Sequence, residues 1–157
     1  MTVIVIHEAG HFIFAAASGV KIREMRFGVF GFRLVCCDAE TTYFRYLLLY
    51  AGGAALNLLT AFIPGTGESF RLYSLGAAAF NLLPLYGCDG CGILRCLILC
   101  ISRSDLALLY ADRAVRVCSD ITLAVLWFFS VYMNLTGGGS LPLLLIMVFF
   151  IICRCKT

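Results

Sequence analysis

The chain has 157 residues, of which 62% are hydrophobic and 13% are charged, and its formal net charge is +3. Ordinary soluble domains are about 45–50% apolar, so much of this protein's surface is expected to face lipid. The positive charge is small and dispersed, and no basic run alternates with aromatic residues, which argues against a nucleic-acid partner. We therefore expect an all-α membrane protein, folded as a single domain over residues 1–157 and crossing the lipid bilayer with about five segments.

The first predicted helix covers about residues 2–18, and its apolar sequence is interrupted by His7, Glu8 and His11. Residues four apart lie on one face of a helix, about 6 Å apart, so the two imidazoles can bind one zinc ion. Glu8 follows the first histidine, where a carboxylate can take a proton from metal-bound water. The pattern H-E-x-x-H also occurs by chance, but polar side chains are costly in lipid and mark a functional site there. No basic region precedes the apolar run, so we interpret the segment as a retained helix rather than a signal peptide.

The connection after this helix contains a partly alternating stretch at residues 25–35, with glycines at positions 28 and 31. This pattern predicts a short hairpin or membrane-dipping loop. An ordinary interfacial connection, with its phenylalanines in the headgroup zone, is the equal alternative.

The second predicted helix covers about residues 46–63, and its Gly52 and Gly53 are expected to allow close helix packing. Asn57 in this helix, and Asn81 in the next, have two interpretations. They could orient a substrate backbone near a metal, or they could hydrogen-bond across helices as structural contacts.

The third apolar segment, about residues 70–101, is too long for one straight span, and a break is expected around Pro84–Gly90. Irregular backbone at membrane depth is tolerated only where it is buried in protein or lines a polar cavity. Asp89 lies in this break, whereas the other candidate carboxylates fall in or near connections. Catalytic zinc usually has three protein ligands, so Asp89 is the best third ligand by elimination. The alternative is an aspartate that caps a helix.

The last two predicted helices cover about residues 117–135 and 140–153. If five segments alternate, ten of the twelve basic residues fall on one side, in the connections 19–45 and 102–116 and at the C-terminus. Basic residues concentrate on the cytoplasmic side of membrane proteins. We therefore expect a multi-pass protein of the cell membrane whose C-terminus and basic connections are cytoplasmic.

Three motifs resemble those of the site-2 proteases, which are intramembrane zinc metalloproteases. They are His7-Glu-Ala-Gly-His11, Gly53-Ala-Ala-Leu-Asn57, and Asn81-Leu-Leu-Pro84 followed by Cys88-Asp89-Gly90. The resemblance covers about residues 1–100 and is closest to the small bacterial sporulation-type branch, whose members cleave a membrane-associated precursor of a sigma factor.

The resemblance implies that His7, His11 and Asp89 bind Zn²⁺ and that Glu8 is the catalytic base. It implies a catalytic core over about 1–101, followed by C-terminal helices over about 117–154. The expected partners are a membrane-associated protein substrate and a regulatory membrane protein.

The chain departs from the family pattern in three ways. Ala54 stands where the family usually has proline and Cys88 where it usually has leucine, and neither change removes a ligand. The family normally has a transmembrane helix before the zinc-binding one, whereas six residues precede His7, so we expect a truncated start or a reduced form.

Two other functions fit parts of the pattern. Broken helices with buried histidine and aspartate also build ion sites in transporters, although transport gives no reason for a glutamate directly after the first histidine. A catalytically inactive membrane scaffold is the third interpretation, and the presence of all four site residues disfavours it.

Overall fold

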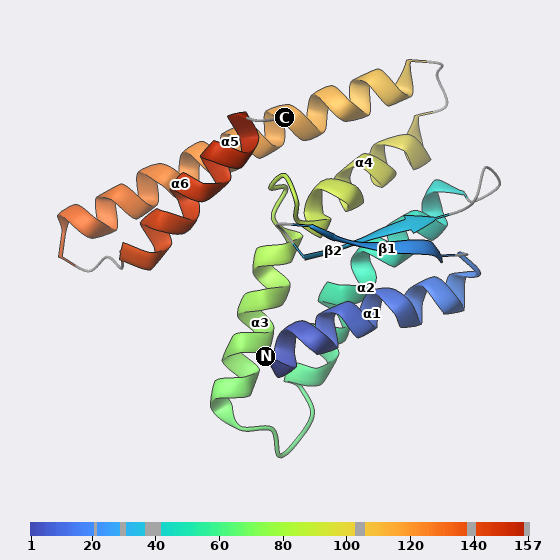
Figure 1. Ribbon diagram of the computed structural model, residues 1–157, viewed down its shortest axis with the longest axis horizontal. Coiled ribbons are helices and arrows are strands. Elements are labelled where there is room, and N and C mark those ends of the chain that lie inside the picture. Colours follow the sequence, from blue (N-terminus) through green and yellow to red (C-terminus); the bar gives the residue numbers. More distant parts are fainter. Residues whose placement is uncertain (21, 29–30, 37–41, 103–105, 138–140, 156–157) are drawn as a thin grey trace.

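The computed structural model describes residues 1–20, 22–28, 31–36, 42–102, 106–137 and 141–155. These residues form six α-helices and one two-stranded hairpin (Figure 1). In chain order the elements are α1 (Thr2–Ser18), β1 (Ile22–Gly28), β2 (Gly31–Cys36), α2 (Tyr43–Ala61), α3 (Glu68–Leu82), α4 (Asp89–Ile101), α5 (Ala107–Leu135) and α6 (Leu141–Cys155). The expectation of a helical fold is confirmed, with the hairpin as the β-structure among the described residues.

The hairpin pairs β1 and β2 antiparallel, with Met25 opposite Leu34 and Phe27 opposite Phe32. The register is irregular between Ile22 and Glu24. The hairpin expected at residues 25–35 is therefore confirmed, and its insertion into a membrane stays a prediction.

Helix α2 is the centre of the fold, because it packs against α1, α3 and α4. Its contact with α1 depends on glycine. A β-carbon at Gly10 would overlap the carbonyl oxygen of Gly52, and one at Gly52 would lie 2.7 Å from the carbonyl oxygen of Gly10. The two backbones are therefore in direct contact, as expected for small residues at a helix interface in a membrane protein.

The predicted break in the third segment is confirmed, but its predicted end at Gly90 is wrong, because Asp89 and Gly90 belong to the next helix. Helix α3 ends at Leu82 and α4 begins at Asp89, and Leu85 between them is only 1% exposed. The backbone N–H of Tyr86 donates a hydrogen bond to Ser119 Oγ on α5, at 3.0 Å. Gly87 adopts φ 95°, a conformation that side chains with a β-carbon rarely take. The break is thus an ordered turn held against α5.

The predicted start of the fourth helix at residue 117 is wrong, because α5 begins at Ala107. Arg113 and Arg116 therefore lie on the helix rather than in a connection, and Asp112 Oδ1 pairs with Arg95 Nε at 2.8 Å. The apolar run marks the part of a helix that suits lipid, but the helix itself continues into charged sequence. With 29 residues, α5 is about 44 Å long, more than the roughly 30 Å hydrocarbon core of a bilayer.

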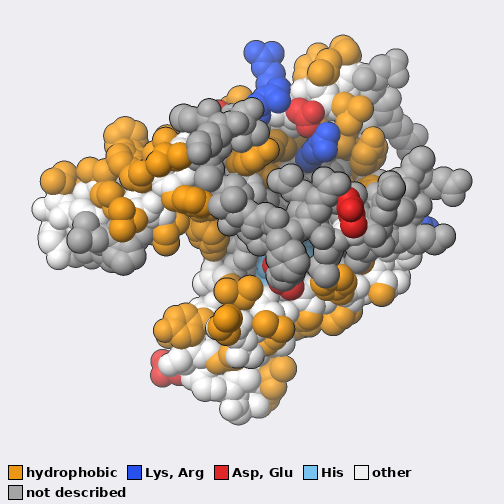
Figure 2. All heavy atoms as spheres, in the orientation of Figure 1, with side chains coloured by type: hydrophobic (Ala, Val, Ile, Leu, Met, Phe, Trp, Pro, Cys, Tyr) orange, Lys and Arg blue, Asp and Glu red, His pale blue; other side chains and the backbone are white. Residues whose placement is uncertain are grey.

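Among the described residues, α5 is the one helix long and apolar enough to cross a membrane, and α1 is a shorter apolar helix. Much of the α5 surface is apolar and exposed, including Phe128 at 73%. In Figure 1, α5 and α6 lie side by side and extend away from α1 and α3, and Figure 2 shows hydrophobic side chains over this arm. Such a continuous apolar surface indicates membrane association. Five membrane spans, and the cytoplasmic side of the connections, stay predictions.

Candidate metal centre

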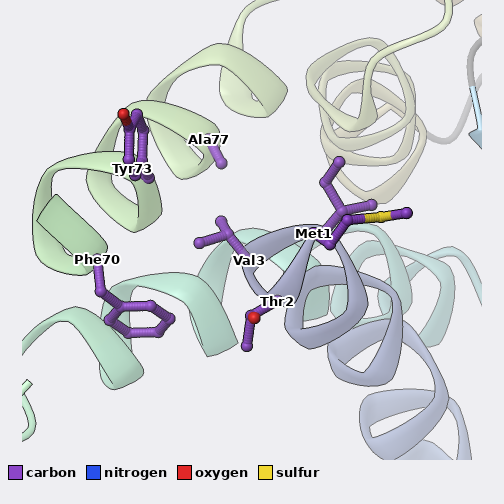
Figure 3. Close-up of a pocket in the computed structure, with 7 residues that line it drawn as sticks. Met1, Thr2, Val3, Phe70, Tyr73 and Ala77 are labelled. Atoms are coloured by element: carbon purple, nitrogen blue, oxygen red, sulfur yellow. The ribbon is translucent and has the colours of Figure 1, made fainter.

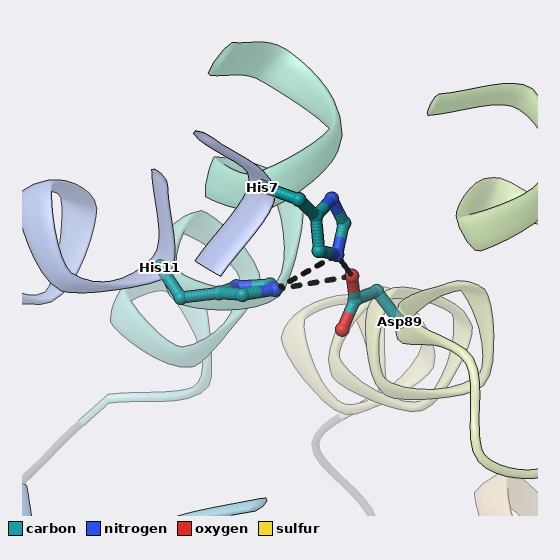
Figure 4. A group of neighbouring side chains, drawn as sticks. All are labelled: His7, His11 and Asp89. Carbon is teal, nitrogen blue, oxygen red and sulfur yellow. Dashed lines mark hydrogen bonds and ion pairs between the residues drawn. The ribbon is translucent and has the colours of Figure 1, made fainter. Parts of the chain in front are cut away.

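Two histidines of α1 meet one aspartate of α4 between the helices (Figure 4). Asp89 Oδ2 lies 3.0 Å from His7 Nε2 and 3.2 Å from His11 Nε2. The two Nε2 atoms lie 3.3 Å apart. The histidines are 7% and 6% exposed, so the group is largely withdrawn from solvent. Residues separated by nearly eighty positions in the sequence thus present three ligand atoms to one point.

The triangle of ligand atoms fits a zinc ion. In a tetrahedral site with metal–ligand distances of about 2.0–2.1 Å, neighbouring ligand atoms lie about 3.3–3.4 Å apart. The edges observed here are 3.0, 3.2 and 3.3 Å. In addition, Asp89 Oδ2 is buried and faces both imidazole nitrogens, so a cation held between the three atoms would contact it directly. Two imidazole nitrogens and one carboxylate oxygen are a donor set that zinc accepts, with a fourth position left for water.

The turn before α4 places Asp89. Cys88 is the N-cap residue of α4, and its side chain makes no capping hydrogen bond. A β-carbon at Gly90 would overlap the carbonyl oxygens of Leu82 and Leu83, so glycine lets the start of α4 sit against the end of α3. Asp89 is therefore the first residue of the helix, and its carboxylate is turned toward the histidines instead of capping the backbone. The alternative in which Asp89 caps the helix is wrong.

Helix α2 lines the other side of the two imidazole rings. His11 Nδ1 lies 2.8 Å from the backbone carbonyl oxygen of Leu49, and the Asn57 amide nitrogen lies 3.4 Å from His7 Nδ1. Between these contacts lies Gly53, where a β-carbon would be 2.6 Å from both His11 Nε2 and His7 Cε1. Leu49, Gly53 and Asn57 are spaced by four residues, so they form one stripe of α2 facing the rings.

Glu8 follows His7 on α1 and is partly buried. Its position beside the first histidine suits a proton acceptor at this centre, and that role stays a prediction.

The two asparagines have different surroundings. Asn57 is 0% exposed and contacts His7, so it is part of the centre. Asn81 is partly buried, and its amide donates to the carbonyl oxygen of Ala77 in its own helix at 3.0 Å. This bond is a local helix contact.

Sequence reasoning missed the Leu49 carbonyl, because a backbone acceptor has no residue-type signal. It treated Gly53 as a helix-packing residue, whereas its missing side chain also makes room for the histidine rings.

An apolar groove of about 530 Å³ lies apart from this centre, between the first turn of α1 and helix α3 (Figure 3). Val3, Phe70 and Tyr73 line it. None of the three candidate ligands lines it.

No protein-family model matches the chain, and no curated protein matches it in sequence. Its structure is similar to that of a site-2 protease from Methanocaldococcus jannaschii, with a TM-score of 0.59 and 21% sequence identity. The alignment covers 95% of this chain and 70% of that chain. At this level of identity the similarity shows a shared fold, and the function has to be argued from the residues of the site.

Proposed function

We propose that this protein is an intramembrane zinc metalloprotease that hydrolyses a peptide bond of a membrane-associated protein. The observation that carries the proposal is the convergence of His7, His11 and Asp89 with the edge lengths of a zinc site, beside the carboxylate of Glu8. The shared fold with a site-2 protease supports it.

In this mechanism His7, His11 and Asp89 would hold the zinc ion. Bound zinc lowers the pKa of a water molecule toward about 7 and polarises a carbonyl group. Glu8 takes a proton from the attacking water while the water oxygen bonds to the carbonyl carbon of the scissile peptide. Glu8 then returns this proton to the leaving amine, which breaks the carbon–nitrogen bond.

The substrate in this proposal is a membrane-associated protein with an unwound or extended segment, since a helix hides its carbonyl groups in hydrogen bonds. The β1–β2 hairpin offers strand edges with which such a segment can pair. By resemblance to the sporulation-type branch, a membrane-associated precursor of a regulatory protein such as a sigma factor is the kind of substrate we propose. A regulatory membrane partner and a multi-pass arrangement with a cytoplasmic C-terminus belong to the same proposal.

A small metal-ion transporter is the second candidate, because a buried histidine–aspartate group next to a broken helix also suits ion binding. A catalytically inactive scaffold is the third. The three functions differ in what they require of Glu8.

The test is Glu8→Gln in the full chain, purified in detergent and reconstituted with a membrane-anchored peptide substrate. We expect wild-type protein to hold one zinc ion per chain and cleave the substrate, and Glu8→Gln to hold the same zinc and lose cleavage. Glu68→Gln, at the exposed start of α3, is the matched control and should cleave normally.

Cleavage by Glu8→Gln at the wild-type rate would remove Glu8 from the mechanism. Zinc flux into proteoliposomes that persists in this variant, without cleavage by the wild type, would favour the transporter. Zinc binding without cleavage or flux in the wild type would favour the scaffold.

A further inference from the structure

Asn57 is a fully buried amide in the middle of α2, and within the part of the chain that the structure describes only one of its ends is paired. Its Nδ2 lies 3.4 Å from His7 Nδ1, whereas its Oδ1 has no hydrogen-bond partner among the described residues. A buried amide oxygen without a partner is unfavourable and calls for an explanation. In the proposed metalloprotease His7 is a metal ligand, but Asn57, which contacts the other nitrogen of the His7 ring, has no role yet.

His11 shows which proton arrangement the centre uses. A backbone carbonyl only accepts hydrogen bonds, so the contact between His11 Nδ1 and the Leu49 oxygen requires the proton on Nδ1. In neutral His11 the lone pair is then on Nε2, which faces His7 and Asp89. A metal ligand needs this arrangement, because a protonated nitrogen cannot bind a cation.

For His7 the same arrangement depends on the amide of Asn57. If the NH₂ group of Asn57 faces His7 Nδ1, it donates a hydrogen bond to the lone pair of that nitrogen. The proton of neutral His7 is then on Nε2, at a corner of the ligand triangle. If the amide oxygen of Asn57 faces His7 Nδ1 instead, it accepts a hydrogen bond from the Nδ1–H group. The proton then stays on Nδ1, and the lone pair is on Nε2. A half-turn of the planar amide exchanges its two ends without moving the rest of the side chain.

We propose that Asn57 is a positioning residue for the metal centre: in the zinc-bound protein its Oδ1 accepts the Nδ1–H of His7 and directs the His7 Nε2 lone pair to the metal. This arrangement pairs the buried Oδ1, turns the NH₂ group to the side that Oδ1 occupies in this structure, and gives both histidines the same tautomer, each held by an acceptor on α2. It extends the α2 stripe of Leu49, Gly53 and Asn57, in which the first residue orients His11 and the last orients His7. The inference rests on the proposed zinc site.

Two variants separate an acceptor role from a structural one. Asn57→Asp keeps the size and can accept, whereas Asn57→Leu keeps the approximate size and can neither accept nor donate. The matched control is Asn134→Leu on α5, because the Asn134 amide donates to the carbonyl oxygen of Ser130 in its own helix. The assay is zinc affinity of the purified full chain in detergent, measured by competition with a chromophoric chelator.

We expect Asn57→Leu to bind zinc about 10–100-fold more weakly, which is the usual effect of removing a group that orients a metal ligand. Asn57→Asp should bind zinc at least as tightly as the wild type, and Asn134→Leu should bind like the wild type. An aspartate variant that loses as much affinity as the leucine variant would overturn the acceptor role. Unchanged affinity in Asn57→Leu would overturn any positioning role.

A spectroscopic measurement on the wild type tests the inference even if a variant fails to fold. The chain has two histidines, His7 and His11, so ¹⁵N-histidine labelling reports only on this centre. In the zinc-loaded protein both rings should carry their proton on Nδ1. A proton on Nε2 of His7 would overturn the inference while leaving zinc binding intact, whereas the proton of His11 is set by the Leu49 carbonyl and serves as the internal reference. Failure of the wild type to bind zinc at all would overturn the proposed function as well, so the two failures are distinguishable.

Discussion

Gly53→Ala tests whether the space beside the histidine rings is needed for the centre. The added β-carbon would lie 2.6 Å from His11 Nε2 and 2.6 Å from His7 Cε1. Carbon atoms pack best against their neighbours at about 3.5 Å, so either the rings or α2 must move by about 1 Å. The His11 ring is held by its contact with the Leu49 carbonyl at 2.8 Å and is only 6% exposed, which leaves it little room.

A shift of this size is large compared with the tolerance of a metal site, in which ligand distances vary by about 0.2 Å. A misplacement of about 1 Å can lower an enzyme's rate about 100-fold. We therefore expect Gly53→Ala to lose both zinc affinity and cleavage by about that factor. The measurements are chelator competition and cleavage of the membrane-anchored peptide.

Gly76→Ala is the matched control, because Gly76 lies on α3 and a β-carbon there would meet nothing within 4 Å. Alanine is favoured over glycine within a helix by about 0.5–1 kcal/mol, so this variant should be as stable as the wild type or slightly more stable, and should bind zinc normally. Wild-type zinc affinity and cleavage in Gly53→Ala would show that the histidine rings do not need the space left by the missing side chain.

Two further variants test the groups that supply and place the third ligand. Asp89→Ala removes one corner of the ligand triangle, so metal analysis should show loss of bound zinc. Asp112→Ala is its control and should keep the zinc, because it breaks the partly exposed ion pair with Arg95. Zinc retained at full affinity in Asp89→Ala would exclude this residue as a ligand. Ser119→Ala leaves the Tyr86 N–H without its acceptor and should lower the free energy of unfolding by about 1–3 kcal/mol, with weaker zinc binding as the turn before Asp89 loosens. Ser130→Ala on the same helix is its control, because the buried Ser130 hydroxyl has no hydrogen-bond partner among the described residues. Equal effects of the two serine variants on chemical denaturation and zinc affinity would contradict this role for Ser119.

The local features of this protein can be predicted from its amino-acid sequence. The spacing of His7 and His11 places both rings on one helix face, because helical periodicity is a property of neighbouring residues. Pro84 ends one helix because its ring fixes φ and removes an N–H donor, and Gly87 allows the turn that follows because it has no β-carbon and can take a positive φ. At residues 25–35 the same local chemistry offered a hairpin beside an equal alternative, an interfacial connection, and the strand pairing in the structure selects the hairpin.

Tertiary structure decided what surrounds these features. The start of α5 at Ala107 could not be read from apolarity, because a helix that extends beyond a lipid layer continues through charged residues. The acceptor for His11 is a backbone carbonyl at Leu49, and every residue has such a group. The contact of Asn57 with His7 depends on how closely α1 and α2 approach, and that distance is set by glycines on both helices. Periodicity therefore places groups on one segment, whereas packing between distant segments selects which of them meet and what each one does.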